Sequence, residues 1–153
     1  MRYLSRTYAN SGRGTSVYAE HVLEHEVSVV GAIQDLGVPV RLHICGDMTP
    51  LIGHVAQTGA RMIDIDYAVD LRFACERLAR LSPESYAVGN FNPVTVLLQG
   101  TPDDVRAACR DCEQQAAGCE NFILSPGCEV PPATPIENYA AMLEFGWRAW
   151  AGQ

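Results

Sequence analysis

The chain alternates between segments with helical periodicity and short apolar runs of strand length. Residues 17–36 repeat apolar side chains at helical spacing and are followed by Gly37, so they predict a helix that ends there. Four short apolar runs follow, at residues 38–45, 61–66, 86–90 and 121–124, and a helix-like segment comes after each. Strands that alternate with helices indicate an α/β fold with a parallel sheet.

Three of the predicted helices begin at a threonine–proline pair, at residues 49–50, 101–102 and 134–135. A threonine side chain can accept a hydrogen bond from a free backbone N–H, and proline at the first helical position loses none. Residues 134–137 also have the Thr-x-x-Glu spacing of a capping box. We therefore expect Thr49, Thr101 and Thr134 to cap helices.

Four strand–helix units are compatible with two architectures. They can form an open doubly wound sheet, or half of a TIM-type (β/α)₈ barrel, which needs roughly 250 residues when it is complete. The chain has 153 residues, and its start is polar. We expect a polar N-terminal segment at residues 1–16 and one α/β unit at residues 17–153.

Side chains alternate across a strand, so the first run divides into an aliphatic face and a polar face. The aliphatic face contains Val40, Leu42 and Ile44, and the polar face contains Arg41, His43 and Cys45. The second run repeats this division, with Asp64 and Asp66 on its polar face. Carboxylates on an inner face need partners or a ligand, so the polar faces are candidates for a functional site.

Chemically versatile residues gather where the predicted strands end. Cys45 ends the first run, Asn90 and Asn92 lie at the end of the third, and Cys128 follows the fourth. Parallel α/β folds place their sites at the carboxyl ends of the strands. This end of the sheet is therefore the expected site.

Composition narrows the class of protein. With 48% hydrophobic and 19% charged residues, the chain is typical of soluble globular domains. The net charge of −7 argues against broad binding to nucleic acids or anionic membranes. No apolar run approaches the length of a membrane span, and the first residues lack the apolar core of a signal peptide. We expect a cytoplasmic protein without nucleic-acid or membrane partners.

The six cysteines are expected to be thiols or metal ligands, because disulfides are rare in cytosolic proteins. His43 and Cys45 share a strand face, and Cys128 lies at the end of another strand. One imidazole and two thiolates suit zinc, and three protein ligands leave a fourth position open for a substrate. Packing of a buried histidine and inert thiols is the common alternative, and spacing alone leaves both open.

Two other motifs favour structural interpretations. His21, Glu24 and His25 match the H-x-x-E-H pattern of some zinc proteases, but they lie in an ordinary amphipathic helix. Cys109 and Cys112 form a C-x-x-C pair in mid-helix, whereas a reactive thiol needs an exposed, electropositive site. We expect a solvated helix face for the first motif and buried packing for the second.

Three segments, LHICGD, GNFNPVTVLLQGTPDDV and SPGCEVPPATPIENYAAM, together resemble the uroporphyrinogen decarboxylase superfamily. Within it they are similar to the zinc-dependent methylcobamide:thiol methyltransferases, of which the coenzyme M methyltransferases are best known. His43, Cys45 and Cys128 fall at the zinc-ligand positions of that branch. In the decarboxylases, a histidine follows the glycine before position 128 and the His-x-Cys pair is absent.

The resemblance implies that residues 17–153 form the C-terminal half of a TIM-type barrel. It further implies zinc-dependent methyl transfer from a methylated corrinoid (methylcobamide or methylcobalamin) to a small-molecule thiol such as coenzyme M. His43, Cys45 and Cys128 would be the catalytic zinc ligands, and the substrate thiolate would take the open position. A corrinoid protein is then an expected partner.

The roles of three neighbouring residues stay open in the sequence. Asp66 is expected as a fourth zinc ligand or as the partner of His43, and pairing with a nearby arginine is an equal alternative. Asn90 and Asn92 are candidates for cofactor or substrate contacts, although asparagines before a proline often form turns.

Members of the superfamily are about twice as long as this chain, which resembles only their second half. A half barrel exposes sheet edges and an apolar flank. We therefore expect a homodimer that covers the gap, or a partner that supplies the missing N-terminal half. Two alternatives to the methyltransferase hypothesis are a tetrapyrrole carboxy-lyase like uroporphyrinogen decarboxylase and a non-catalytic half-barrel binding module.

Overall fold

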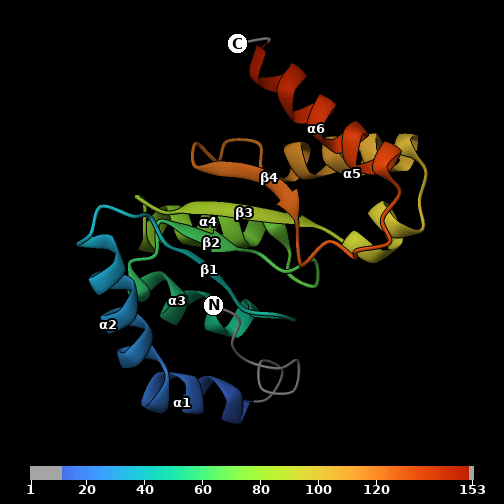
Figure 1. Ribbon diagram of the computed structural model, residues 1–153. Helices are drawn as coiled ribbons and strands as arrows, with labels where there is room; N and C mark the ends of the chain where they lie inside the picture. The colour runs from blue at the N-terminus through green and yellow to red at the C-terminus, as the bar shows by residue number, and fades with distance from the viewer. Residues whose placement is uncertain (1–11, 152–153) are drawn as a thin grey trace.

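Four parallel strands form one continuous sheet in the computed structural model, which describes residues 12–151 (Figure 1). The strands are β1 (Arg41–His43), β2 (Met62–Asp64), β3 (Tyr86–Phe91) and β4 (Phe122–Pro126). Their order in the sheet is the order in the chain, and every neighbouring pair is parallel. A doubly wound sheet reverses its strand order at a switch point, whereas a barrel does not. The four predicted strands and the half-barrel architecture are therefore confirmed.

Helices occupy the connections between the strands. The elements are α1 (Gly12–His21), α2 (Leu23–Gln34), η1 (Thr49–Leu51), α3 (Ile52–Val55), η2 (Ala56–Thr58), α4 (Leu71–Leu81), η3 (Pro93–Leu98), α5 (Pro102–Gln115) and α6 (Ile136–Ala151). Helices α1 and α2 precede β1, and α6 follows β4. None of the helices within residues 12–151 combines the length and hydrophobicity that a bilayer span requires.

The hydrophobic core lies between the sheet and the helices packed on one of its faces. Ile44, Ile63 and Ile65 from the strand segments are almost fully buried together with Leu71 and Leu78 of α4. Burial of each such side chain stabilises the fold by about 1.5–3 kcal/mol. The predicted division of the strands into an aliphatic and a polar face is thus confirmed, because these aliphatic residues all point into the core.

The single helix predicted at residues 17–36 is wrong in its bounds. Helix α1 begins at Gly12, inside the segment predicted as a polar N-terminal stretch, and the helix breaks at Val22. Tyr18 lies just before the break; it is buried, and its hydroxyl donates a 2.5 Å hydrogen bond to Glu26 in the next helix. Burial raises the pKa of Tyr18, and the hydrogen bond to Glu26 raises it further. The remainder of the predicted N-terminal segment, residues 1–11, lies outside the described residues.

Only one of the three predicted threonine caps forms. The Thr101 hydroxyl accepts a 3.3 Å bond from the Asp104 N–H, and the Asp104 carboxylate accepts a 2.8 Å bond from the Thr101 N–H. This is a complete capping box at the start of α5. The Thr101 hydroxyl also donates a 2.7 Å bond to the Asp104 carboxylate, and this bond together with that from the Thr101 N–H lowers the pKa of Asp104.

The predicted caps at Thr49 and Thr134 do not form. Asp47 accepts a 3.0 Å bond from the Thr49 N–H, and the threonine side chain caps nothing there. Helix α6 begins at Ile136, one residue later than a Thr134 cap requires. Within the described residues, the buried Thr134 hydroxyl has no hydrogen-bond partner. The Thr134 N–H closes a turn by donating a 3.0 Å bond to Pro131 O.

Candidate metal centre

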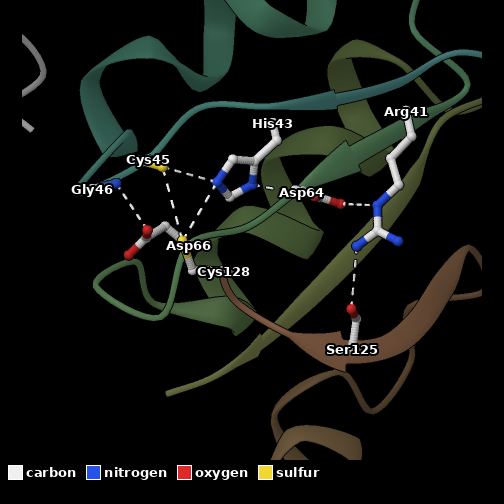
Figure 2. A network of polar contacts seen from close by, with 8 residues as sticks. All are labelled: Arg41, His43, Cys45, Gly46, Asp64, Asp66, Ser125 and Cys128. Carbon is white, nitrogen blue, oxygen red and sulfur yellow. Dashed lines mark hydrogen bonds and ion pairs between the residues drawn. The ribbon is translucent and has the colours of Figure 1, made fainter. Parts of the chain in front are cut away.

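Three side chains from two strand ends converge at one point (Figure 2). His43 is the last residue of β1, Cys45 follows two residues later, and Cys128 lies just after β4. The distance from His43 Nε2 to Cys45 Sγ is 3.1 Å, and that from His43 Nε2 to Cys128 Sγ is 3.7 Å. The two sulfur atoms are 3.8 Å apart. The fold therefore brings together residues separated by more than 80 positions in the chain.

This triangle of donor atoms fits a tetrahedral zinc ion. Zn–S and Zn–N bonds of ordinary length place two sulfurs about 3.8 Å apart and a nitrogen and a sulfur about 3.6 Å apart. Two of the three observed distances are close to these edges, and the shortest, from His43 Nε2 to Cys45 Sγ, would have to lengthen by about half an ångström. All three side chains are half-buried. The residues present thus match zinc in donor type and in spacing, with one position left open.

Asp64 fixes the orientation of the His43 ring. Its Oδ2 lies 3.2 Å from His43 Nδ1, and its Oδ1 accepts a 2.6 Å bond from Arg41 Nε. An ionised carboxylate only accepts hydrogen bonds, so Nδ1 carries the proton and Nε2 presents its lone pair to the cysteines. Arg41 also donates a 3.2 Å bond to Ser125 of β4. The polar faces of three strands are thus tied together beside the ligand triangle.

The carboxylate that contacts His43 belongs to Asp64 and not to Asp66. The strand pattern points to Asp66 as a fourth ligand, as the partner of His43 or as the partner of an arginine, but the residue in register with His43 is Asp64. Asp64 shares the predicted polar face, so strand parity was the signal that could have identified it. Parity does not supply the register between β1 and β2, which selects Asp64 over Asp66.

Asp66 instead holds the turn that follows Cys45. Its Oδ2 accepts a 2.8 Å bond from the Gly46 N–H, and its Oδ1 accepts a 2.9 Å bond from the Ala68 N–H. The side chain is buried. The group of potential ligands in the described part of the chain comprises His43, Cys45 and Cys128 and does not include Asp66.

Gly127 allows Cys128 to reach the site. A side-chain carbon at this position would lie 2.7 Å from Asn90 O and closer still to Tyr67 N. The Gly127 N–H donates a 2.8 Å bond to Phe91 O, which continues the β3–β4 pairing into this loop. The backbone after β4 can therefore pass close to the loop after β2 only because residue 127 lacks a side chain.

Both asparagines expected as cofactor contacts have roles within the fold. The buried Asn90 side chain donates a 2.7 Å bond to Val69 O and a 3.3 Å bond to Asp66 O. Asn92 accepts bonds from the N–H groups of Val94 and Thr95 and so caps η3. The contacts of Asn92 match the alternative that the sequence left open, in which the asparagine before the proline forms a turn. Asn90 lies in β3 instead, and its side chain holds the loop that follows β2.

Neither of the two motifs interpreted as structural belongs to the group of potential metal ligands in the described residues. His21 ends α1, whereas Glu24 and His25 belong to α2, so the motif does not lie on one continuous helix. Cys109 and Cys112 are buried in α5, and burial raises the pKa of Cys109 to about 12 and that of Cys112 above its ordinary value. The buried pair is therefore a poor nucleophile at neutral pH.

Comparisons with known proteins identify the family. Residues 14–147 match the family model described as uroporphyrinogen decarboxylase (URO-D). The methylcobamide:CoM methyltransferase MtbA of Methanosarcina mazei is 34% identical over 131 residues, which cover 86% of this chain and 36% of that protein. The MtbA of Methanosarcina acetivorans is 32% identical over the same shares. A uroporphyrinogen decarboxylase of Synechococcus sp. is 38% identical over 109 residues, or 71% of this chain and 29% of that enzyme.

A solved structure supports the fold independently. A methyltransferase from Methanosarcina mazei superimposes with a TM-score of 0.76 at 20% identity, covering 89% of this chain and 38% of that one. The chain therefore spans little more than a third of the length of the relatives that it matches. Because the family match extends over most of its residues, the chain belongs to the uroporphyrinogen decarboxylase family.

Proposed function

We propose that this chain carries the zinc site of a methyltransferase that moves a methyl group from a methylated corrinoid to a thiol such as coenzyme M. The observation that carries the proposal is the triangle formed by His43, Cys45 and Cys128. The relatives named methylcobamide:CoM methyltransferase add support, because their names state this donor and acceptor. The zinc-binding residues, the thiol acceptor and the corrinoid donor are all parts of this proposal.

Zinc, when bound, supplies a positive charge that lowers the pKa of a coordinated thiol and keeps it as a thiolate near neutral pH. His43 and the two cysteines would hold the ion at the carboxyl end of the sheet. A neutral imidazole and two thiolates would balance the charge of the divalent ion and leave one position for the substrate sulfur. Asp66 keeps the turn after Cys45 in place.

The proposed reaction conserves atoms and charge. The substrate thiol releases its proton, and its sulfur forms a bond to the methyl carbon of the corrinoid. The carbon–cobalt bond breaks, and its electron pair stays on cobalt. The products are a thioether and the demethylated, reduced corrinoid. Asp64 holds His43 in the orientation that this arrangement needs throughout.

A second candidate is a decarboxylase acting on a tetrapyrrole. The 38% identity to the Synechococcus enzyme favours it, although that match covers a shorter part of the chain. A decarboxylase of this type does not require two thiolates beside a histidine, so the ligand triangle favours the methyltransferase. A non-catalytic half barrel is the third alternative, and it predicts neither reaction.

Metal content tests the proposal directly. We expect purified protein to hold about one zinc per chain, and Cys45→Ala or Cys128→Ala to lose it. Cys119→Ala is the matched control, since this half-buried cysteine lies outside the triangle. Folded protein without zinc would contradict the metal site. Thiol-dependent loss of the methylcobalamin absorbance then separates the methyltransferase from a zinc-binding module.

A further inference from the structure

A cavity of about 270 Å³ lies between α4 and the end of α5, and none of the three candidate metal ligands lines it. Arg72 and Cys75 line it from α4, and Gly118 and Cys119 line it from the turn after α5. Arg72 Nη2 donates a 3.0 Å hydrogen bond to Gln114 O, which ties the two walls together. A water-sized molecule occupies about 30 Å³, so the cavity has room for a small polar reagent.

The two cysteines of this cavity are in contact with each other. The Cys75 side chain is buried, whereas that of Cys119 is half-buried. Burial raises the pKa of the Cys75 thiol, and a side-chain hydrogen bond with Cys119 raises it further. Cys75 therefore keeps its proton at neutral pH, and Cys119 is the member of the pair that a reagent from the solvent reaches first.

Cys119 lies in the turn that joins α5 to β4. Gly118 precedes it with a φ of 86°, a conformation that favours glycine. The Cys119 N–H donates a 2.8 Å bond to Ala116 O, and its thiol donates a 3.6 Å bond to Asn121 O. Residue 119 itself belongs to no helix or strand. The turn can therefore supply the small movement that brings two sulfurs to the bonding distance of about 2.0 Å.

We propose that Cys119 and Cys75 form a peroxide-sensitive thiol pair, in which Cys119 is oxidised first and Cys75 then closes a disulfide with it. In the first step the Cys119 sulfur attacks one oxygen of hydrogen peroxide, the O–O bond breaks, and a sulfenic acid and water are formed. In the second step the Cys75 sulfur bonds to the Cys119 sulfur, and the Cys75 proton leaves with the hydroxyl group as a second water. The two thiols lose two electrons, which the peroxide accepts.

The other four cysteines have different surroundings. Cys109 and Cys112 are 0% and 2% exposed, so a reagent from the solvent does not reach them in the folded chain. Cys45 and Cys128 belong to the candidate metal centre, and their sulfurs are 3.8 Å apart. Peroxide can reach that half-buried pair as well, so the experiment has to distinguish the two pairs.

The inference does not depend on zinc or on methyl transfer, and peptide mapping tests it separately. The chain would be treated with equimolar hydrogen peroxide, its remaining thiols blocked with N-ethylmaleimide, and the product cut after Arg and Glu. These cuts place Cys75 in residues 73–76, Cys119 in residues 114–120 and every other cysteine in a different peptide. We expect these two peptides to be recovered as one linked species that lacks two hydrogen atoms. Cys119 should react roughly tenfold faster than Cys109, or more.

Serine variants separate the two roles. In Cys75→Ser, Cys119 should stop at the sulfenic acid, which dimedone traps, and in Cys119→Ser, Cys75 should stay reduced. Cys109→Ala is the matched control and should keep the linked species. Circular dichroism confirms that each variant is folded.

Urea unfolding provides a second readout. A disulfide between positions 75 and 119 restricts the unfolded chain, so oxidation should raise the urea midpoint of the unmodified chain, and dithiothreitol should reverse the rise. Neither serine variant should show it. Absence of the linked species, a link that joins a different pair of cysteines in its place, or oxidation of Cys119 without bonding to Cys75 would overturn the proposal.

Discussion

The Asp64 carboxylate lies 3.2 Å from Nδ1 of His43 and directs the opposite nitrogen of the ring toward two cysteine sulfurs. The same carboxylate accepts a 2.6 Å bond from Arg41 and is largely buried. Metal-binding histidines commonly donate their second N–H to such a carboxylate, which fixes both tautomer and ring orientation. Asp64 is therefore placed to orient His43 in the candidate metal centre, although it is not one of the three candidate ligands.

Replacing Asp64 tests this role. We expect Asp64→Asn to weaken zinc binding by roughly 10–100-fold, because the amide cannot hold the charge and orientation of the imidazole equally well. Competition with a chromophoric chelator measures the affinity without reference to activity. Asp103→Asn is the matched control, since Asp103 is exposed and pairs with Arg106 on the surface of α5. Equal affinities for the two variants would show that Asp64 serves the fold alone.

Gly127 is expected to tolerate no side chain. In Gly127→Ala the new methyl group would collide with backbone atoms of Tyr67 and Asn90, which cannot move aside as a flexible side chain can. We expect a loss of stability on the order of 2 kcal/mol or more, and weaker zinc binding because Cys128 is displaced. Urea unfolding and metal titration measure the two effects.

Gly31→Ala provides the comparison for Gly127→Ala. An added carbon at this helical position meets nothing within 4 Å, so alanine should stabilise α2 by up to about 1 kcal/mol. If both glycine variants behave alike, the close approach at Gly127 does not constrain the loop.

The buried thiol of Cys109 makes stability depend on pH in the alkaline range. Burial raises its pKa from an ordinary value of 9.0 to about 12. Between these values the folded chain keeps a proton that the unfolded chain releases, so the free energy of unfolding falls as pH rises. The contribution is fully present below pH 9 and is lost as the pH approaches 12.

Urea unfolding at about pH 8 and about pH 10.5 measures this effect. Cys109→Ala removes the titrating group, so its unfolding free energy should fall less between the two pH values than that of the unmodified chain. The slope with pH is compared rather than absolute stability, because the smaller side chain also leaves a cavity. An identical slope in both proteins would rule out a contribution from Cys109.

Asn138 anchors α6 to the turn after η3. Its buried amide donates a 2.9 Å bond to Leu97 O and a 2.8 Å bond to Gly100 O. Asn138→Ala leaves two carbonyls without these partners, and we expect a loss of about 1–3 kcal/mol in thermal or urea unfolding. Asn121→Ala, which removes one exposed bond to Pro83, should lose less. A larger loss at Asn121 would contradict this assignment.

Strand positions and strand faces follow from local pattern, and this part of the fold is predictable. The aliphatic residues Val40, Leu42 and Ile44 alternate with Arg41, His43 and Cys45, and alternation is a property of a single extended chain. The strand–helix rhythm likewise predicts parallel pairing, because the apolar runs are short and each is followed by a helical segment. Helix bounds are less predictable, because no glycine or proline marks the break at Val22.

The sequence by itself determined the types of donor atom in the candidate site and the strand ends from which they come. Only the tertiary structure decided that Asp64 rather than Asp66 faces His43, because the register between two strands depends on their packing in the sheet. The same is true of Cys128, whose approach to Cys45 needs the close passage of the chain at Gly127. The exposed apolar side chains on α2 and α6, Ile33 and Trp147 among them, also become apparent only after folding, since exposure is a relation between elements rather than a property of residues.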